Sequence, residues 1–187
     1  TFVGGLCAQG ATLTGDANVA VGYSAGLMIT AGTENTLIGG NAGDALTTGN
    51  YNTAVGKDAL GGDDLGIGTT AIGHGSAQSL NYASETTSSI TGVGFQTSFY
   101  NVTGTGNTCL GYRAGFGVSG NSNSSNTAVG SSALYSVTTG SNNTIMGNAA
   151  GYAITTGDNN LFLGKDAGRT GSPGGQWTTQ SSIMVLG

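Results

Sequence analysis

The chain has 187 residues, of which 37 are glycine and only 7% are charged, and its formal net charge is −5. This excess of acidic over basic residues makes a phosphate backbone or an anionic membrane surface an unfavourable partner, so we exclude nucleic-acid binding. No apolar run approaches the roughly 20 residues of a membrane span, and no segment has the pattern of a signal peptide. We expect a protein that is not inserted in a membrane, and its low charge together with many Asn, Ser and Thr residues suits an extracellular location.

A repeat runs along nearly the whole chain. A short apolar stretch ends in glycine nine times, with spacings of 17, 17, 17, 21, 17, 19, 17 and 17 residues. These glycines are Gly22, Gly39, Gly56, Gly73, Gly94, Gly111, Gly130, Gly147 and Gly164. A fixed short period predicts stacked units that bury their apolar positions against their neighbours, and we do not expect an enzyme.

Each unit follows the consensus Asn-Thr-x-Val-Gly-x-x-Ala-Gly-x-x-Leu-Thr-Thr-Gly-x-x, as in Asn35 to Tyr51. Positions are counted below from the opening Asn. Short apolar stretches punctuated by Gly at the fifth, ninth and fifteenth positions predict brief strands joined by tight corners, at which Gly supplies positive φ and close backbone approach. The predicted fold is all-β, a parallel β-solenoid (β-roll or β-helix) of about ten 17-residue coils.

The fourth, eighth and twelfth positions are apolar and are expected to fill the interior of the coil. The twelfth position holds Ile29, Leu46, Leu80, Val118, Val137 and Ile154. The third position, on the opposite side of the strand from the fourth, is also apolar, as in Leu37 and Phe162. A strand that is apolar on both faces is usually covered on both faces. The simplest cover for so thin a solenoid is another copy of the chain.

The Asn at the first position of most units predicts a ladder at one corner, because Asn tolerates a left-handed conformation and its amide can bond the equivalent amide one coil away. Cys7 and Cys109 lie about six units apart, which is too far for a disulfide at roughly 4.8 Å per coil. We expect both cysteines to be small packing residues, and we predict no cofactor.

The repeat solenoid covers residues 1–171, and residues 172–187 form an irregular loop and the start of a further, truncated repeat. Both ends of the chain cut through a repeat, so we expect a piece of a longer polypeptide. In chain order, Asp63-Asp64 marks an irregular corner that is either solvated or bound to Ca²⁺. Next comes His74, the only histidine, which is expected to be exposed and inert. No metal site is predicted.

Insertions are expected to form loops on one face, around Tyr82 to Ser89 and around Asn121 to Ser125. The tenth position is aromatic in four consecutive units, Phe99, Phe116, Tyr135 and Tyr152. Stacked coils place these rings in one column, which is either a sugar-binding surface or part of a chain-to-chain interface. Trp177, in the C-terminal loop, is either a fifth ligand contact or the end of the regular shaft. These five aromatic residues are the candidate ligand-binding residues.

The string Asn52-Thr53-Ala54-Val55-Gly56 resembles the Ser-Val-Ala-Ile-Gly head repeats of trimeric autotransporter adhesins, which form a parallel β-roll. The longer string Thr47 to Gly56 resembles the Thr-Thr-Gly-x-x-Asn-Thr-Ala-Val-Gly arrays of phage tail-fibre proteins, and the 17-residue period favours the latter. The resemblance implies a homotrimer, with the solenoids intertwined or packed together, in an extracellular fibre on a virion tail or cell surface.

The expected function is therefore host or cell-surface attachment by a non-enzymatic fibre segment, through a cell-surface glycan or outer-membrane receptor. The alternative is a structural subunit of a self-polymerising extracellular filament. A third hypothesis, an ice-binding solenoid, is disfavoured because the Thr columns are interrupted.

Overall fold

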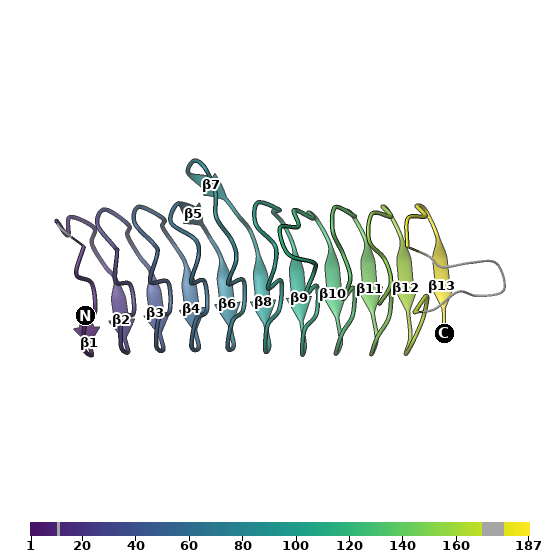
Figure 1. The fold of residues 1–187 in the computed structure, drawn as a ribbon, viewed down its shortest axis with the longest axis horizontal. Helices are drawn as coiled ribbons and strands as arrows, with labels where there is room; N and C mark the ends of the chain where they lie inside the picture. Colours follow the sequence, from purple (N-terminus) through teal and green to yellow (C-terminus); the bar gives the residue numbers. More distant parts are fainter. Residues whose placement is uncertain (11, 170–177) are drawn as a thin grey trace.

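The computed structural model describes residues 1–10, 12–169 and 178–187 as a stack of parallel coils with the two termini at opposite ends (Figure 1). Its strands are β1 (Phe2–Val3), β2 (Val19–Val21), β3 (Thr36–Ile38), β4 (Thr53–Val55), β5 (Gly66–Ile67), β6 (Thr70–Ile72), β7 (Thr86–Thr87), β8 (Thr91–Val93), β9 (Thr108–Leu110), β10 (Thr127–Val129), β11 (Thr144–Met146), β12 (Leu161–Leu163) and β13 (Met184–Leu186). Within the described ranges there is no helix, and hence none long and apolar enough to cross a membrane.

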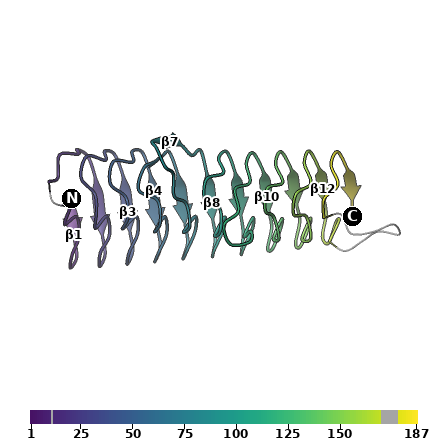
Figure 2. The same ribbon diagram turned by 45° about the horizontal axis from the view of Figure 1, so that its top comes forward.

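One parallel sheet of eleven strands runs along the stack, in the order β1-β2-β3-β4-β6-β8-β9-β10-β11-β12-β13 (Figure 2). Neighbouring strands pair position by position, so that Thr53, Ala54 and Val55 face Thr70, Ala71 and Ile72. The 21-residue unit keeps this register, because Thr70 still pairs with Thr91. The predicted parallel β-solenoid is confirmed. Both cysteines are free, as expected.

The third position of each unit, rather than the fourth, faces the interior. Leu37, Ile145 and Phe162 have no exposed surface, whereas Ile38 and Met146 at the fourth position are 39% and 42% exposed. Alternate residues of a strand point to opposite faces, so the middle residue of a three-residue strand points inward and its two neighbours point outward. The prediction that the fourth position fills the core was therefore wrong, while the eighth and twelfth positions do line the interior.

The insertion in the Asn107 unit lies slightly earlier than predicted. Residues 118–120 are exposed, and Val118 is 48% exposed instead of filling the twelfth position. Asn121 takes that interior place, where it forms a parallel bridge with Asn101 of the coil before. The longer insertion forms β7, which pairs with β5 in a separate two-stranded sheet that projects from the stack (Figure 1). Tyr82 is buried and donates a hydrogen bond to the Gly104 carbonyl.

Glycine at the fifth position is required for two reasons. Its φ lies between 116° and 138° along the stack, a region that favours glycine. A Cβ on Gly39 would lie 2.6 Å from the Gly56 carbonyl oxygen of the next coil. At the fifteenth position glycine serves close approach alone, because Gly49 has no positive φ but a Cβ there would lie 2.4 Å from the Gly66 oxygen. At the fifteenth position the predicted close approach is therefore confirmed, whereas the predicted positive φ was wrong.

The predicted Asn ladder is present and buried. The side-chain amide of Asn35 donates to Asn18 Oδ1 at 3.0 Å and to the Gly49 carbonyl at 2.9 Å, and Asn143 bonds Asn126 in the same way. Each ladder oxygen also accepts the backbone N–H of the first residue of the next coil, as Asn35 Oδ1 does from Asn52. The left-handed residue is the one before the Asn, for example Glu34, so the conformational reason given for Asn was wrong.

Candidate functional site

The four aromatic residues at the tenth position form one stacked column. Successive ring centroids of Phe99, Phe116, Tyr135 and Tyr152 lie 5.4, 5.0 and 4.8 Å apart, with interplanar angles of 15° or less. All four side chains are half-buried within a single chain. The sequence prediction of a column is therefore borne out by this spacing.

Ring faces inside this column are covered by the neighbouring rings. At one end the Arg169 guanidinium lies 5.7 Å from the Tyr152 centroid, and at the other Phe99 lies against Gly75. A pyranose packs on a ring face, whereas this column presents ring edges to solvent. Its part in ligand binding remains a prediction, and Trp177 lies outside the described residues.

A second aromatic column, at the sixth position, was missed by the sequence analysis. His74 and Phe95 stack at 5.2 Å and 10°, and Phe95 and Tyr112 stack at 5.4 Å and 9°. Phe95 and Tyr112 are 40% and 49% exposed, so this column is more open than the first. The signal was available, because all three residues follow the fifth-position glycine of consecutive units. His74 is exposed as expected, but it takes part in this stack.

Arg113 connects the two columns. Its guanidinium carbon lies 5.2 Å from the Tyr112 centroid, 6.0 Å from that of Phe95 and 5.1 Å from that of Phe116. Its Nε donates a 2.9 Å hydrogen bond to Gln96 Oε1 in the coil before. The side chain is half-buried, and within residues 1–10, 12–169 and 178–187 no carboxylate lies at ion-pair distance from it.

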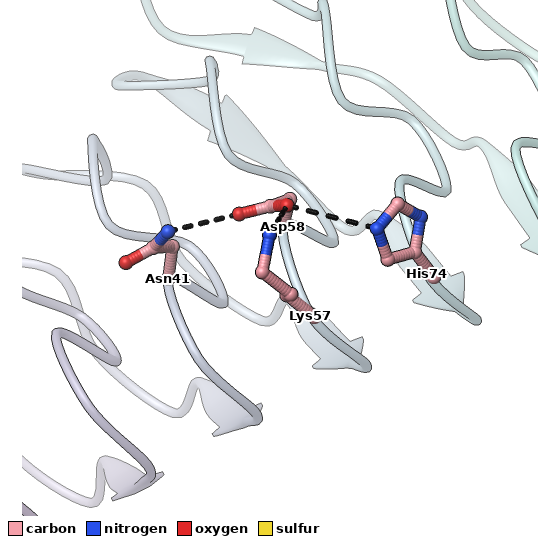
Figure 3. A network of polar contacts seen from close by, with 4 residues as sticks. All are labelled: Asn41, Lys57, Asp58 and His74. Carbon is pink, nitrogen blue, oxygen red and sulfur yellow. Dashed lines mark hydrogen bonds and ion pairs between the residues drawn. The ribbon is translucent and has the colours of Figure 1, made fainter.

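A polar cluster lies beside the His74 end of the second column (Figure 3). Asp58 accepts hydrogen bonds from Asn41 at 2.9 Å and from Lys57, and His74 Nε2 lies 3.8 Å from Asp58 Oδ2. Partial burial opposes ionisation of Asp58, but the bonds from Lys57 and Asn41 and the nearby positive charge outweigh it and lower the pKa of its carboxyl. The cluster is an exposed charge network of modest strength.

Asp63 is not at a solvated corner, so that alternative was wrong for this residue. It occupies the twelfth position of its coil and has no exposed surface. Its Oδ1 accepts the Gly66 N–H at 2.9 Å, while Oδ2 has no hydrogen-bond partner. Among the described residues no group of three or more His, Cys, Asp or Glu side chains is placed to hold a metal ion.

The outer face of the sheet is uncharged and regular. Its fourth-position column consists of Val21, Ile38, Val55, Ile72, Val93, Leu110, Val129, Met146 and Leu163. Its second-position column is Thr in seven strands, Thr36, Thr53, Thr70, Thr91, Thr108, Thr127 and Thr144. We call this surface the strand face. No charged residue lies on it between β2 and β12.

Comparison of the chain with protein-family models, with curated proteins and with solved structures finds no match. The residues that the structure describes enclose no pocket. Its candidate binding surfaces are therefore the open strand face and the two aromatic columns.

Proposed function

We propose that this chain is a non-enzymatic segment of an extracellular attachment fibre, on a virion tail or a cell surface, and that it assembles as a homotrimer. The observation that carries the proposal is the fourth-position column, an apolar side chain in each of the nine strands from β2 to β12 of the eleven-stranded sheet that is half-buried or exposed in the single chain. A contiguous exposed apolar surface of this size is typical of a protein–protein interface. A second copy covers it without leaving a charge buried, because the strand face carries none.

The count of three rests on the resemblance of the repeat to fibre arrays, and the dimensions of the strand face give the area that such an assembly buries. Nine strands at roughly 4.8 Å make it about 43 Å long, and three residues make it about 10 Å wide, or about 400 Å² for each copy. Three copies around a common axis would bury about 1,200 Å² together, the whole strand face of each copy. In parallel copies, equivalent positions of the 17-residue repeat also lie at the same level along the common axis.

The experiment is the solution mass of the purified chain, measured by light scattering during size-exclusion chromatography, together with negative-stain microscopy. We expect short rods with three times the chain mass. Replacing Ile72 and Val93 with Glu places two like charges on adjacent strands of the interface, which should dissociate the rods into folded monomers. Met28→Glu is the matched control, because Met28 is 52% exposed but lies outside the strand face.

Circular dichroism of the double variant separates loss of assembly from loss of folding. A monomeric wild-type chain would contradict the proposal. Long filaments would instead support the alternative, a structural subunit of a self-polymerising extracellular filament. Attachment itself is tested by binding of labelled rods to whole cells. The two expected classes of partner are cell-surface glycans and outer-membrane receptors.

A further inference from the structure

Arg113 is a cation without an anion in an acidic protein. Two of the other three basic residues make ion pairs, Lys57 with Asp58 and Arg169 with Asp166. In the described part of the chain, the only hydrogen bond of the Arg113 guanidinium is the one from Nε to Gln96. The four N–H groups on its two terminal nitrogens therefore remain for a ligand, in the planar fork that matches a carboxylate.

The aromatic rings hold this guanidinium in place. Three ring centroids lie within 6.0 Å of it, and its Nε is bonded to Gln96, so few rotamers remain to be lost on binding. Guanidinium–ring contacts of this kind are favourable without neutralising the charge. Arg113 is thus a preorganised donor rather than a loose surface side chain.

Tyr112 supplies a ring beside the guanidinium. The second aromatic column ends at this residue, because Ser131 occupies the sixth position of the next coil. One face of the Tyr112 ring stacks on Phe95, and on its other side the next side chain of the column is the small one of Ser131. Tyr112 is 49% exposed, so its ring is more accessible than that of Phe95, which is 40% exposed.

The charges around Arg113 do not repel an anion. The nearest carboxylates in its own seventh-position column are Asp58 and Asp166, each three coils away, or about 14 Å along the axis. That distance exceeds the Debye length of about 8 Å at physiological ionic strength. The seventh positions of the two adjoining coils are Gln96 and Ser132, both uncharged.

We propose that Arg113 and Tyr112 form a binding site for a carboxylate-bearing pyranose, with the carboxylate on the Arg113 fork and the C–H face of the sugar ring on Tyr112. The class of ligand in this inference rests on the attachment function proposed above. The receptor is then an acidic cell-surface polysaccharide. The site does not depend on the trimer, because both residues come from adjacent positions of one chain.

The test is isothermal titration of the intact chain with trigalacturonate and with its fully methyl-esterified form, which keeps the sugar rings but removes the charge. We expect trigalacturonate to bind and the ester to bind at least about tenfold more weakly, because a charge-assisted fork is lost. Arg113→Gln should cause a similar loss. Gln already occupies the equivalent position, Gln96, with the same φ of 53°, so this variant should fold.

The matched control is Arg169→Gln. Arg169 also lies near a ring, Tyr152, but its guanidinium is occupied by Asp166, so trigalacturonate binding should be unchanged. Tyr112→Ala should weaken the ester and should weaken trigalacturonate by at least the same factor, because it removes the ring contact that both share and one of the three rings that hold the Arg113 guanidinium. Equal binding of ester and acid, equal losses in the two arginine variants, or no binding by the wild type at millimolar ligand would each overturn the site. Solution mass measured on every sample distinguishes these outcomes from failure of the fibre proposal.

Discussion

At the scale of the residue, Asp63 is an exception to the apolar character of the twelfth position. The twelfth position holds Leu46 in the coil before and Leu80 in the coil after, yet Asp63 lies between them without exposed surface and with Oδ2 unpartnered. Burial raises the pKa of this carboxyl to about 6, and the backbone N–H groups of Gly66 and Leu65 only partly compensate. Because the pKa is raised in the folded state, the charged form destabilises the fold above that pH.

Asp63→Asn should therefore stabilise the protein at pH 7, by up to about 3 kcal/mol if the whole pKa difference is recovered. As the pH falls from about 6 to about 4, the folded wild type takes up a proton that the unfolded chain does not, so the advantage of the variant should shrink. Thermal unfolding of both proteins between pH 4 and pH 8 measures this. An advantage for the variant that stays constant with pH would contradict the prediction.

Asp58→Asn is the opposite case and serves as a control for the pH series. The pKa of Asp58 is lowered in the folded protein, so its contribution to stability is present above the unfolded pKa and is lost as the pH falls. This variant should be slightly less stable than the wild type at pH 7 and equal to it in acid. Because the carboxyl lies near the surface, the effect should be small.

Two adjacent glycines provide a second test at this scale. Gly39→Ala forces a residue with a Cβ into φ +133° and places that Cβ 2.6 Å from the next coil, so it should destabilise the fold by at least about 2 kcal/mol. Gly40→Ala meets nothing closer than 4.0 Å and has no positive φ, so it should change stability by less than about 0.5 kcal/mol. Denaturant unfolding of the two variants compares them directly. Similar losses would contradict the assignment of the fifth position.

At the scale of the element, the coils are joined at one corner by the buried Asn ladder. Asn126 is connected on both sides, since its backbone N–H donates to Asn107 Oδ1 and its own Oδ1 accepts from the backbone and side chain of Asn143. Its side-chain amide also donates to the Gly140 carbonyl. Removing this one side chain leaves several buried polar groups of two coils without partners.

Asn126→Ala should accordingly destabilise the fold by about 2–4 kcal/mol, because each buried group left unpaired costs about 1–3 kcal/mol. Hydrogen exchange should show the Asn143 amide losing protection first. Asn148→Ala, at the exposed sixth position, removes the same side chain without a buried partner and should be nearly neutral. If both variants were equally stable, the prediction that the ladder links the coils would be contradicted.

The sequence predicted the period, the parallel pairing and the Asn ladder, because each recurs with every coil and so appears as a pattern. It did not show which of two neighbouring apolar positions, Leu37 or Ile38, faces inward, since a strand of three residues has too few alternations to fix the register. The second aromatic column was missed although its signal was present, because it spans only three units and one of its rings is a histidine, His74, which was assessed only as a metal ligand. Arg113 could not be found from the pattern, because its role depends on rings contributed by two columns.

At the scale of the whole molecule, the solenoid has two cores rather than one. One apolar cluster runs from Ala20 to Ile90 and the other from Cys109 to Ala167. At their boundary Ser76 and Thr97 replace the usual Ala of the eighth position, and Gly92 occupies the third. The hydroxyls of Ser76 and Thr97 bond each other at 2.7 Å. In a solenoid, where each coil contacts only its neighbours, stability is approximately a sum over adjacent pairs, so we expect this polar layer to be a weak junction between two cooperative halves.

Replacing all three residues of the junction with Ala should fuse the halves. Gly92→Ala alone should destabilise, because its Cβ would lie 2.6 Å from Ser76 Oγ and 2.8 Å from Thr97 Oγ1. Ser76→Ala and Thr97→Ala remove those two atoms, so the triple variant should be more stable than the sum of its parts predicts, as expected for residues in contact. Hydrogen exchange measures the result: in the wild type the two halves should open with different free energies, and in the triple variant with one. Separate opening that persists in the triple variant would show that the boundary is set elsewhere, with the buried Asn101 and Asn121 as the next residues to replace.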